Sequence, residues 1–180
     1  ELIRISGLSH GTDVWLNNAQ DLIKAGTATL NECICTRDDI MNYLIAQGVE
    51  AKMAFNTMES VRKGKGLTGQ MEAAMLEAQV PAWFIDSCKK IKYMFPKAHA
   101  AAYVVSALRI GYFKVHHPIA YYAAYFSVRG DELNAAKVLE GPETIQKHIK
   151  DIRSKDSVST RDEKEIAHLE LAYEMYMRGY

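Results

Sequence analysis

A compact basic segment, Arg62-Lys63-Gly64-Lys65-Gly66, is the first feature whose residue types could do chemistry. Two glycines let the backbone approach an anion closely, while ammonium and guanidinium groups neutralise it, as a phosphate requires. The glycine and lysine spacing of a Walker phosphate loop is missing. An isolated segment of this kind is more often a solvated helix end with flexible glycines, so this second interpretation stays open.

Further cations flank a predicted helix boundary. Lys89, Lys90 and Lys92 share the end of one predicted helix, and Lys97 with His99 opens the next. The first turn of a helix exposes unpaired N–H groups, which together with a cation form an anion site. Alanines at 98 and 100–102 leave that turn free of bulk, so that a base or another surface could pack against it. Taken alone, the pattern favours a close helix contact in the core, with His99 as an interior histidine.

A third segment places glycines, hydroxyls and an imidazole before a predicted helix start: Ser6-Gly7-Leu8-Ser9-His10-Gly11-Thr12. Such a segment can offer backbone and hydroxyl donors to a phosphate or to a base edge. An N-terminal turn and cap is the commoner explanation. The adjacency of Ser9 and His10 does not establish a hydrolytic dyad.

Neither metal ligands nor catalytic residues are predicted. Cys33 and Cys35 form a C-x-C pair with no matching histidine spacing, and Cys88 is distant, so zinc is not expected. Asp38 and Asp39 fall in the first turn of a predicted helix, where the helix dipole explains them better than magnesium does.

The composition is that of an ordinary globular chain. It has 180 residues, 48% hydrophobic and 24% charged, with three cysteines. This excludes collagen, disordered tails and disulfide scaffolds, and the few cysteines fit a reducing cytoplasm. No uninterrupted apolar run approaches the roughly 20 residues that span a bilayer, so no membrane partner is expected. The absence of an initial methionine suggests a piece of a longer protein.

The net charge of zero hides an uneven distribution. Residues 1–59 carry 4 basic and 8 acidic side chains, residues 60–129 carry 10 and 3, and residues 130–180 carry 8 and 11. The three segments therefore have net charges of −4, +7 and −3. The central basic block indicates a nucleic-acid or phosphate partner, which the total charge conceals.

The elements that must position these residues are predicted to be helices almost throughout. Gly26 and Gly48 follow predicted helix ends, Pro81 sits at a favoured helix start, and Thr36 with Asp39 and Thr160 with Glu163 resemble capping boxes. The fold class is therefore all-α, an irregular bundle of about eight or nine helices. The stretch 97–128 is expected to be the most buried, and only 30–35 hints at an extended piece. Helices are expected over 13–25, 37–47, 51–62, 68–79, 82–94, 97–116, 118–128, 131–139, 143–155 and from 160 onward.

The residues also resemble a family. The segments 5–15 (ISGLSHGTDVW), 37–41 (RDDIM), 58–68 (MESVRKGKGLT), 86–104 (DSCKKIKYMFPKAHAAAYV) and 112–118 (YFKVHHP) look like the fingers region of the PolC-type bacterial DNA polymerase III alpha subunit. The order of these segments is the same, and the resemblance covers essentially the whole chain.

The resemblance implies a fragment of a replicative DNA polymerase in the bacterial cytoplasm, inactive alone. Its partners would be primer-template DNA, a deoxynucleoside triphosphate, the palm and other domains of the same chain, and replisome subunits bound outside this fragment. Magnesium would be the cofactor of the full enzyme, held by palm aspartates outside this chain. By resemblance, the nucleotide-binding candidates are Ser6, Gly7, Ser9, His10, Gly11, Arg37, Arg62, Lys63, Lys65, Lys97 and His99, and the DNA-binding candidates are Lys89, Lys90, Lys92 and Tyr103.

Two subdomains are expected. Residues 1–129 would form the main fingers subdomain, with its basic block at 60–129 facing nucleotide and DNA, and residues 130–180 a smaller acidic helical subdomain that is a poor DNA-binding face. The competing hypothesis is a helical DNA- or protein-binding adaptor without catalysis. Palm aspartates upstream in the parent gene would decide between the two.

Overall fold

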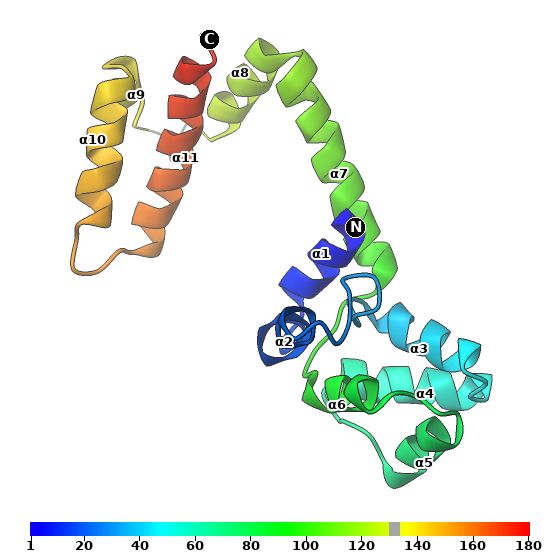
Figure 1. The fold of residues 1–180 in the computed structure, drawn as a ribbon. Helices are drawn as coiled ribbons and strands as arrows, with labels where there is room; N and C mark the ends of the chain where they lie inside the picture. Colours follow the sequence, from blue (N-terminus) through cyan, green and yellow to red (C-terminus); the bar gives the residue numbers. More distant parts are fainter. Residues whose placement is uncertain (130–133) are drawn as a thin grey trace. The chain divides into compact units, whose positions relative to one another are not determined.

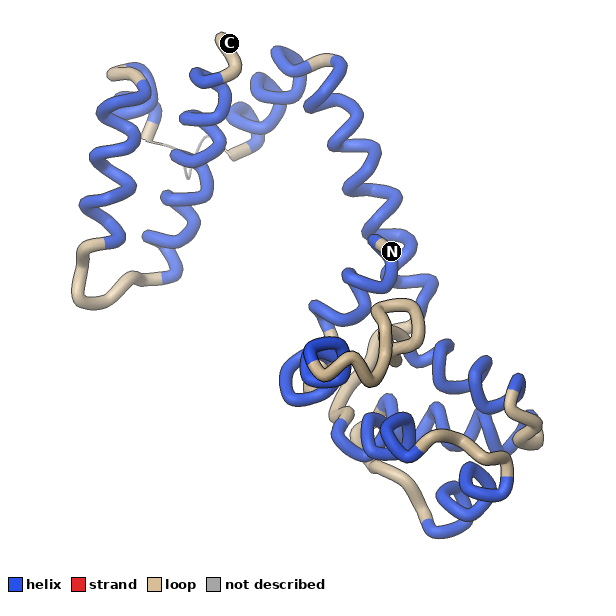
Figure 2. Tube along the Cα trace, viewed as in Figure 1, coloured by secondary structure: helices blue, strands red, loops and turns tan. Residues whose placement is uncertain are grey.

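The computed structural model describes residues 1–129 and 134–180, and helices dominate it (Figures 1 and 2). The described residues form eleven α-helices and one short π-helical segment, with no strand and a single isolated bridge between Thr12 and Tyr93. The predicted all-α class is confirmed, with more helices than the eight or nine expected. The predicted helix over 131–139 lies partly outside the described residues.

The chain divides into two compact units, residues 1–107 and 108–180. Helix α7 (Lys97–His116) begins in the first unit and ends in the second. The first unit also contains α1 (Leu2–His10), η1 (Trp15–Ala19), α2 (Gln20–Lys24), α3 (Arg37–Ala46), α4 (Ala51–Arg62), α5 (Gly69–Glu77) and α6 (Ala82–Lys90). The second also contains α8 (Pro118–Val128), α9 (Ala135–Leu139), α10 (Pro142–Arg153) and α11 (Thr160–Met177). The functional subdomains 1–129 and 130–180 stay a prediction.

The core of the first unit lies between α3 and α4, which pack against each other, and the helices around them. Ile40 and Leu44 are one turn apart on α3 and fully buried, and α4 buries Ala54 and Val61 at helical spacing. Phe84 of α6 is also buried in this cluster. The apolar faces of these helices therefore form the core of the first unit, and the loops that carry the polar motifs connect helices of this core.

The second unit is built on a hairpin of α10 and α11 (Figure 1). Ile145, Ile149 and Ile152 line one face of α10 and pack with Leu169 and Ala172 of α11. These positions repeat every three or four residues, as the burial of one helix stripe requires. The unit therefore has its own apolar core.

The predicted helix over 13–25 is wrong in its first half. Asp13 and Asn17 have φ angles of 56° and 57°, and regular α-helix begins only at Gln20. The cause is Asn18, which is buried and donates from its side-chain amide to the Asp13 carbonyl at 2.9 Å. The Ser87 hydroxyl in turn donates to the Asn18 side chain at 2.7 Å. These hydrogen bonds satisfy the buried side chain of Asn18, and they require a backbone conformation that differs from a continuous helix.

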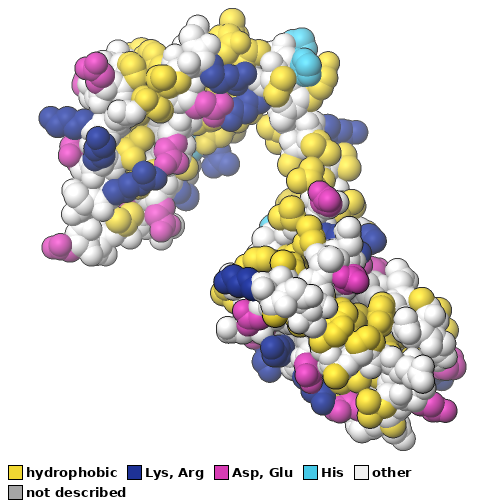
Figure 3. All heavy atoms as spheres, viewed as in Figure 1, with side chains coloured by type: hydrophobic (Ala, Val, Ile, Leu, Met, Phe, Trp, Pro, Cys, Tyr) yellow, Lys and Arg dark blue, Asp and Glu magenta, His cyan; other side chains and the backbone are white. Residues whose placement is uncertain are grey.

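The stretch 97–128 is not the most buried part of the chain, contrary to expectation. Within α7 only Ala100 is buried, and within α8 only Tyr122. Leu108 is 57% exposed and Ile119 is 71% exposed, and apolar side chains are visible along this stretch in Figure 3. An apolar sequence favours burial, yet most side chains of these two helices are not buried. None of the described helices is both long and apolar enough to cross a membrane.

Candidate nucleotide-binding site

An extended segment, residues 91–96, joins parts of the first unit that are far apart in sequence. Helix α6 ends at Lys90, before the predicted end at Met94. Thr12 N–H donates to the Tyr93 carbonyl at 2.9 Å, and Lys92 N–H donates to the Thr12 carbonyl at 3.1 Å. The extended segment is therefore held against the end of the 6–12 motif, and these bonds replace the last helical turn that periodicity predicted.

The same segment also binds the two arginine-bearing motifs. Met94 N–H donates to the carbonyl of Arg62, the first residue of the basic segment, at 3.3 Å. Arg37 N–H donates to the Phe95 carbonyl at 3.1 Å. The backbones of Arg37 and Arg62 are thus hydrogen-bonded to two consecutive residues of the extended segment, Phe95 and Met94 respectively.

Two glycines permit this close approach. A Cβ atom at Gly64 would lie 2.4 Å from the Lys92 carbonyl oxygen, and one at Gly11 would lie 2.9 Å from the Tyr93 carbonyl oxygen. Gly64 also has a φ angle of 69°, which only glycine adopts without strain. Gly11 was predicted to line a nucleotide pocket, and Gly64 was expected to let the backbone approach an anion. In the structure both glycines allow backbone to pack against residues 91–96.

Three predicted phosphate ligands converge on one carboxylate. Arg62 donates from Nη2 to Glu59 Oε2 at 2.9 Å, and Lys63 Nζ lies 2.9 Å from the same oxygen. Arg37 Nη1 lies 3.6 Å from Glu59 Oε1. Hydrogen bonds from Arg62 and then from Lys63 lower the pKa of Glu59 to about 2. The carboxylate is therefore ionised at neutral pH and leaves a net charge of +2 on the cluster.

Three other lysines predicted to bind nucleotide or DNA have exposed side chains. Lys65, Lys92 and Lys97 are exposed, and their ammonium groups have no hydrogen bond or ion pair within residues 1–129 and 134–180. Lys65 follows Gly64, and Lys92 lies opposite that glycine on the extended segment. These ammonium groups can approach an external anion without first losing an internal partner.

The start of α7 carries a stack of aromatic rings. Phe95 and His99 are stacked with ring centroids 4.8 Å apart, and His99 and Tyr103 follow at 4.6 Å. Tyr103 is 60% exposed. Asp38 accepts a hydrogen bond from the Lys97 backbone N–H at 2.6 Å, so one N–H group of this helix start is already occupied. Tyr103 is therefore an exposed aromatic side chain at the start of this helix.

Ser6, Ser9 and His10 lie inside α1 and not in a turn before a helix. The Ser9 hydroxyl lies 3.1 Å from the Ser6 carbonyl oxygen and 2.8 Å from His10 Nδ1, and His10 Nδ1 lies 2.8 Å from the same carbonyl oxygen. Because His10 Nδ1 is shared between the hydroxyl and a backbone carbonyl, this contact alone does not establish an activated nucleophile. Gly7 is buried against the Cys35 carbonyl, so it supports the packing of α1 and presents no surface.

Two of the lysines predicted to bind DNA already have internal partners. Lys89 Nζ lies 2.7 Å from Glu72, and Lys90 Nζ donates to the Asn17 carbonyl at 2.9 Å. Neither is brought into the Glu59 cluster. Only Lys92, on the extended segment, is placed next to the basic motif.

Sequence reasoning missed Glu59 and Phe95. Glu59, Arg62 and Lys63 stand at i, i+3 and i+4 on α4, a spacing that predicts ion pairs on one helix face. That signal was present in the sequence. The place of Phe95 beside His99 depends on the extended segment, which no local pattern predicted.

No group of three or more His, Cys, Asp or Glu side chains in the described residues could hold a metal ion. All three cysteines are free and buried, and burial raises the pKa of Cys35 to about 11. Glu59, the carboxylate beside the basic motif, is engaged with cations. The described part of the chain thus does not fit a magnesium site.

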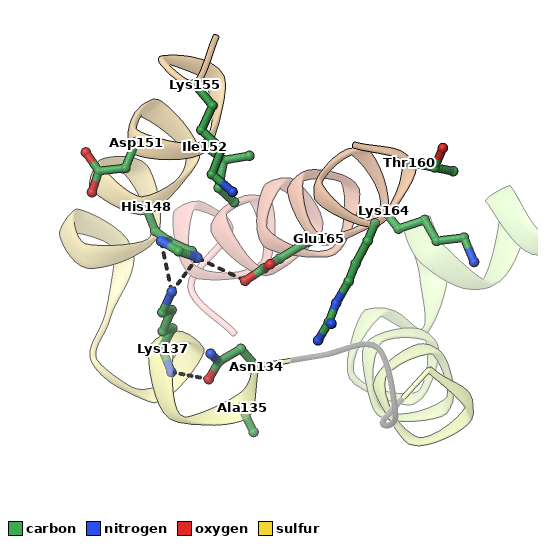
Figure 4. A pocket seen from close by; sticks show the side chains of 11 residues that line it. Asn134, Ala135, Lys137, His148, Asp151, Ile152, Lys155, Thr160, Lys164 and Glu165 are labelled. Carbon is green, nitrogen blue, oxygen red and sulfur yellow. Dashed lines mark hydrogen bonds and ion pairs between the residues drawn. The ribbon is translucent and has the colours of Figure 1, made fainter. Parts of the chain in front are cut away.

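Each unit contains a cavity. In the first unit, Lys97 lines a cavity of about 560 Å³ together with Arg4 and Trp83. In the second, a larger cavity of about 1030 Å³ lies between α9, α10 and α11, where His148 contacts Lys137 and Glu165 (Figure 4). The larger cavity contains none of the predicted nucleotide- or DNA-binding residues.

Comparison with known proteins matches residues 1–80 to the bacterial DNA polymerase III alpha subunit finger domain. The whole chain is 54% identical to the DNA polymerase III PolC-type of Thermotoga maritima over 180 residues. The corresponding identities are 59% for Caldanaerobacter subterraneus, with 99% of the chain covered, and 56% for Listeria innocua, with all of it covered. The resemblance to the fingers of PolC-type DNA polymerase III is confirmed. The chain spans only 12–13% of the length of these relatives, so it corresponds to a fragment of such a polymerase.

Within these polymerase fingers, the finger-domain match contains Gly11, Arg37 and the 62–66 motif, but it ends before residues 91–96. The relatives' identity extends over the remainder. The extended segment that joins the motifs therefore lies outside the matched domain but inside the region shared with the PolC-type proteins.

Proposed function

We propose that this chain binds the triphosphate of an incoming deoxynucleotide and contacts primer-template DNA within a replicative bacterial DNA polymerase. The observation that carries the proposal is the attachment of the Arg37 and Arg62 backbones to residues 91–96, beside three ammonium groups without internal partners. A nucleoside triphosphate carries several negative charges, and phosphoryl transfer needs positioning and charge neutralisation more than a protein nucleophile.

The residues divide by their surroundings. Arg37, Arg62, Lys63 and Lys65 would contact phosphate, with Lys97 close by. Tyr103 would offer its ring to a base, with His99 beside it, as aromatic side chains do in single-strand and template contacts. Ser6, Ser9 and His10 on α1 would lie at the edge of the same site. Lys92 would contact the DNA backbone, and Lys89 and Lys90 could do so only after leaving their internal partners.

The chemistry of the full enzyme would come from elsewhere in the longer polymerase. Magnesium, held by carboxylates outside this chain, would activate the primer hydroxyl and stabilise the leaving pyrophosphate. The part assigned to this chain is to bind, orient and partly neutralise the triphosphate. The palm domain and the replisome subunits in the bacterial cytoplasm would be its partners through other regions.

The test is a binding titration of the 180-residue chain with dGTP and with fluorescent primer-template DNA at low salt. Both should bind weakly, and DNA affinity should fall steeply with salt because phosphate contacts release counterions. Reversing charge at Arg62 and Lys65 (Arg62→Glu, Lys65→Glu) should weaken binding of both by about tenfold or more.

The matched control is Lys150→Glu, which reverses an exposed lysine of the acidic 130–180 segment. It should change DNA affinity by less than about twofold. If neither ligand binds, or if the control weakens binding as much as the double variant, the phosphate assignment is wrong. Binding of DNA without any effect of dGTP would instead support the DNA-binding adaptor.

A further inference from the structure

Glu59 is an acidic side chain at the centre of a site proposed to bind a polyanion. Three cations, Arg37, Arg62 and Lys63, lie within 3.6 Å of its two carboxylate oxygens. A carboxylate beside a triphosphate repels it, and replacing the acid would at first sight improve binding. The geometry argues for the opposite effect.

The cations around Glu59 reach it from two separate elements. Arg62 and Lys63 are one turn further along α4, and Arg37 comes from the first residue of α3. Arg62 grips both carboxylate oxygens, with Nε on one and Nη2 on the other. A planar guanidinium held by two hydrogen bonds has little rotational freedom, so its remaining Nη1 donors keep a fixed direction.

Arg37 is held less completely than Arg62. Its only contact with Glu59 is the 3.6 Å pair through Nη1. Its Nε atom is buried and has no hydrogen-bond acceptor within the described residues. The Arg37 side chain is nevertheless 32% exposed, so an external anion can reach the guanidinium on its open side. Arg37 is therefore the member of the cluster whose guanidinium is least satisfied by Glu59.

We propose that Glu59 is a positioning residue for nucleotide binding: it holds Arg37, Arg62 and Lys63 together so that the triphosphate meets an already ordered cation cluster. This inference rests on the proposed function. Three like charges so close together would separate into solvent without an intervening anion. Nucleotide binding would then have to order three long side chains again, which costs affinity.

The test is the substitution Glu59→Gln, which keeps the shape of the side chain and removes its charge. In the full-length polymerase that carries this sequence, the KM for the incoming nucleotide should rise by about tenfold, from the loss of charge-assisted hydrogen bonds. The kcat should change by less than about twofold, because Glu59 touches the arginines and not the reacting atoms. In the isolated chain, affinity for inorganic tripolyphosphate should fall by the same factor.

Glu72→Gln is the matched control. Glu72 also pairs with a lysine of the first unit, Lys89, at 2.7 Å, so its replacement makes the same change in net charge away from the cluster. It should leave the KM for the nucleotide unchanged. If Glu59→Gln leaves the KM unchanged or lowers it, Glu59 is a competing anion and the positioning role is wrong.

A second variant covers the case in which Glu59→Gln does not fold. Glu59→Asp keeps the charge but shortens the side chain, so it should raise the KM by an intermediate factor while the thermal unfolding midpoint stays close to that of the parent. An unchanged KM for this variant contradicts the proposal. Failure of the unsubstituted chain to bind tripolyphosphate would instead overturn the proposed function, so the two failures are distinguishable.

Discussion

Replacing Gly64 by alanine should damage the first unit more than the same change two residues later. Gly64 and Gly66 have nearly the same left-handed backbone, with φ angles of 69° and 71°. They differ in what a methyl group would meet. At Gly64 the new Cβ would lie 2.4 Å from the Lys92 carbonyl oxygen, whereas at Gly66 nothing lies within 4 Å.

The expected magnitudes follow from two separate costs. An alanine in the left-handed region costs about 1–2 kcal/mol, and both variants incur this. Gly64→Ala must also move two backbone segments apart by about 1 Å, a kind of overpacking that typically costs a further ~1–3 kcal/mol. We expect a loss of free energy of unfolding of about 2–5 kcal/mol for Gly64→Ala and about 1–2 kcal/mol for Gly66→Ala.

The assay is urea unfolding of the 180-residue chain followed by tryptophan fluorescence. Both tryptophans, Trp15 and Trp83, lie in the first unit, so the signal reports on the unit that contains Gly64. The midpoint should fall further for Gly64→Ala, with a similar slope for both variants. The difference isolates the contact with residues 91–96.

If the two variants differ by less than about 0.5 kcal/mol, the usual scatter for surface substitutions, the steric cost expected at Gly64 is absent. Such a result would mean that the basic motif does not pack against the extended segment in solution. The attachment of Arg62 to residues 91–96, on which the proposed site depends, would then fail as well.

Two further predictions concern the interior of the first unit. Asn18→Ala should lower the free energy of unfolding by about 2–4 kcal/mol, because Ser87 and the Asp13 carbonyl lose buried partners. The control is Asn56→Ala, on the exposed face of α4. An equal effect of the two variants in urea unfolding would contradict the role of Asn18. The three cysteines should resist a thiol reagent at pH 8 in the folded chain and react fully in urea, because Cys33, Cys35 and Cys88 are at most 1% exposed and a pKa of about 11 leaves roughly a thousandth of Cys35 as thiolate. Rapid labelling of one thiol without denaturant would show that its packing opens.

Local signals in the sequence placed most helix ends correctly. Asp39 accepts hydrogen bonds from the backbone of Thr36 and Cys35, as the predicted capping box requires, and Thr68 accepts from Met71 N–H. Gly26 and Gly48 have the expected left-handed φ angles of 67° and 94°. The last cap is shifted by one residue, since Ser159 and Asp162 form it instead of Thr160 and Glu163.

The candidate site was only partly predictable. The basic motif, the 6–12 motif and Arg37 were recognisable as residue types, and the resemblance to the PolC-type fingers connected them to nucleotide binding. Their mutual placement depends on backbone N–H and carbonyl groups of residues 91–96, and periodicity assigned residues 91–94 to the end of a helix. Backbone hydrogen bonds between distant segments leave no repeat in the sequence, so they could not be predicted from it.

Most of the helices and caps, and the family, could be predicted from the amino-acid sequence, because these depend on interactions within a few residues or on the motifs themselves. Two features could be seen only in the tertiary structure. Asn18 is hydrogen-bonded to Ser87, 69 residues away, where a helix was predicted, and α7 has exposed apolar side chains. The tertiary structure also decided that Glu59 gathers three cations. Each of these features depends on contacts between segments that are far apart in the sequence. The free energy of such a contact depends on both segments, so neither segment predicts it alone.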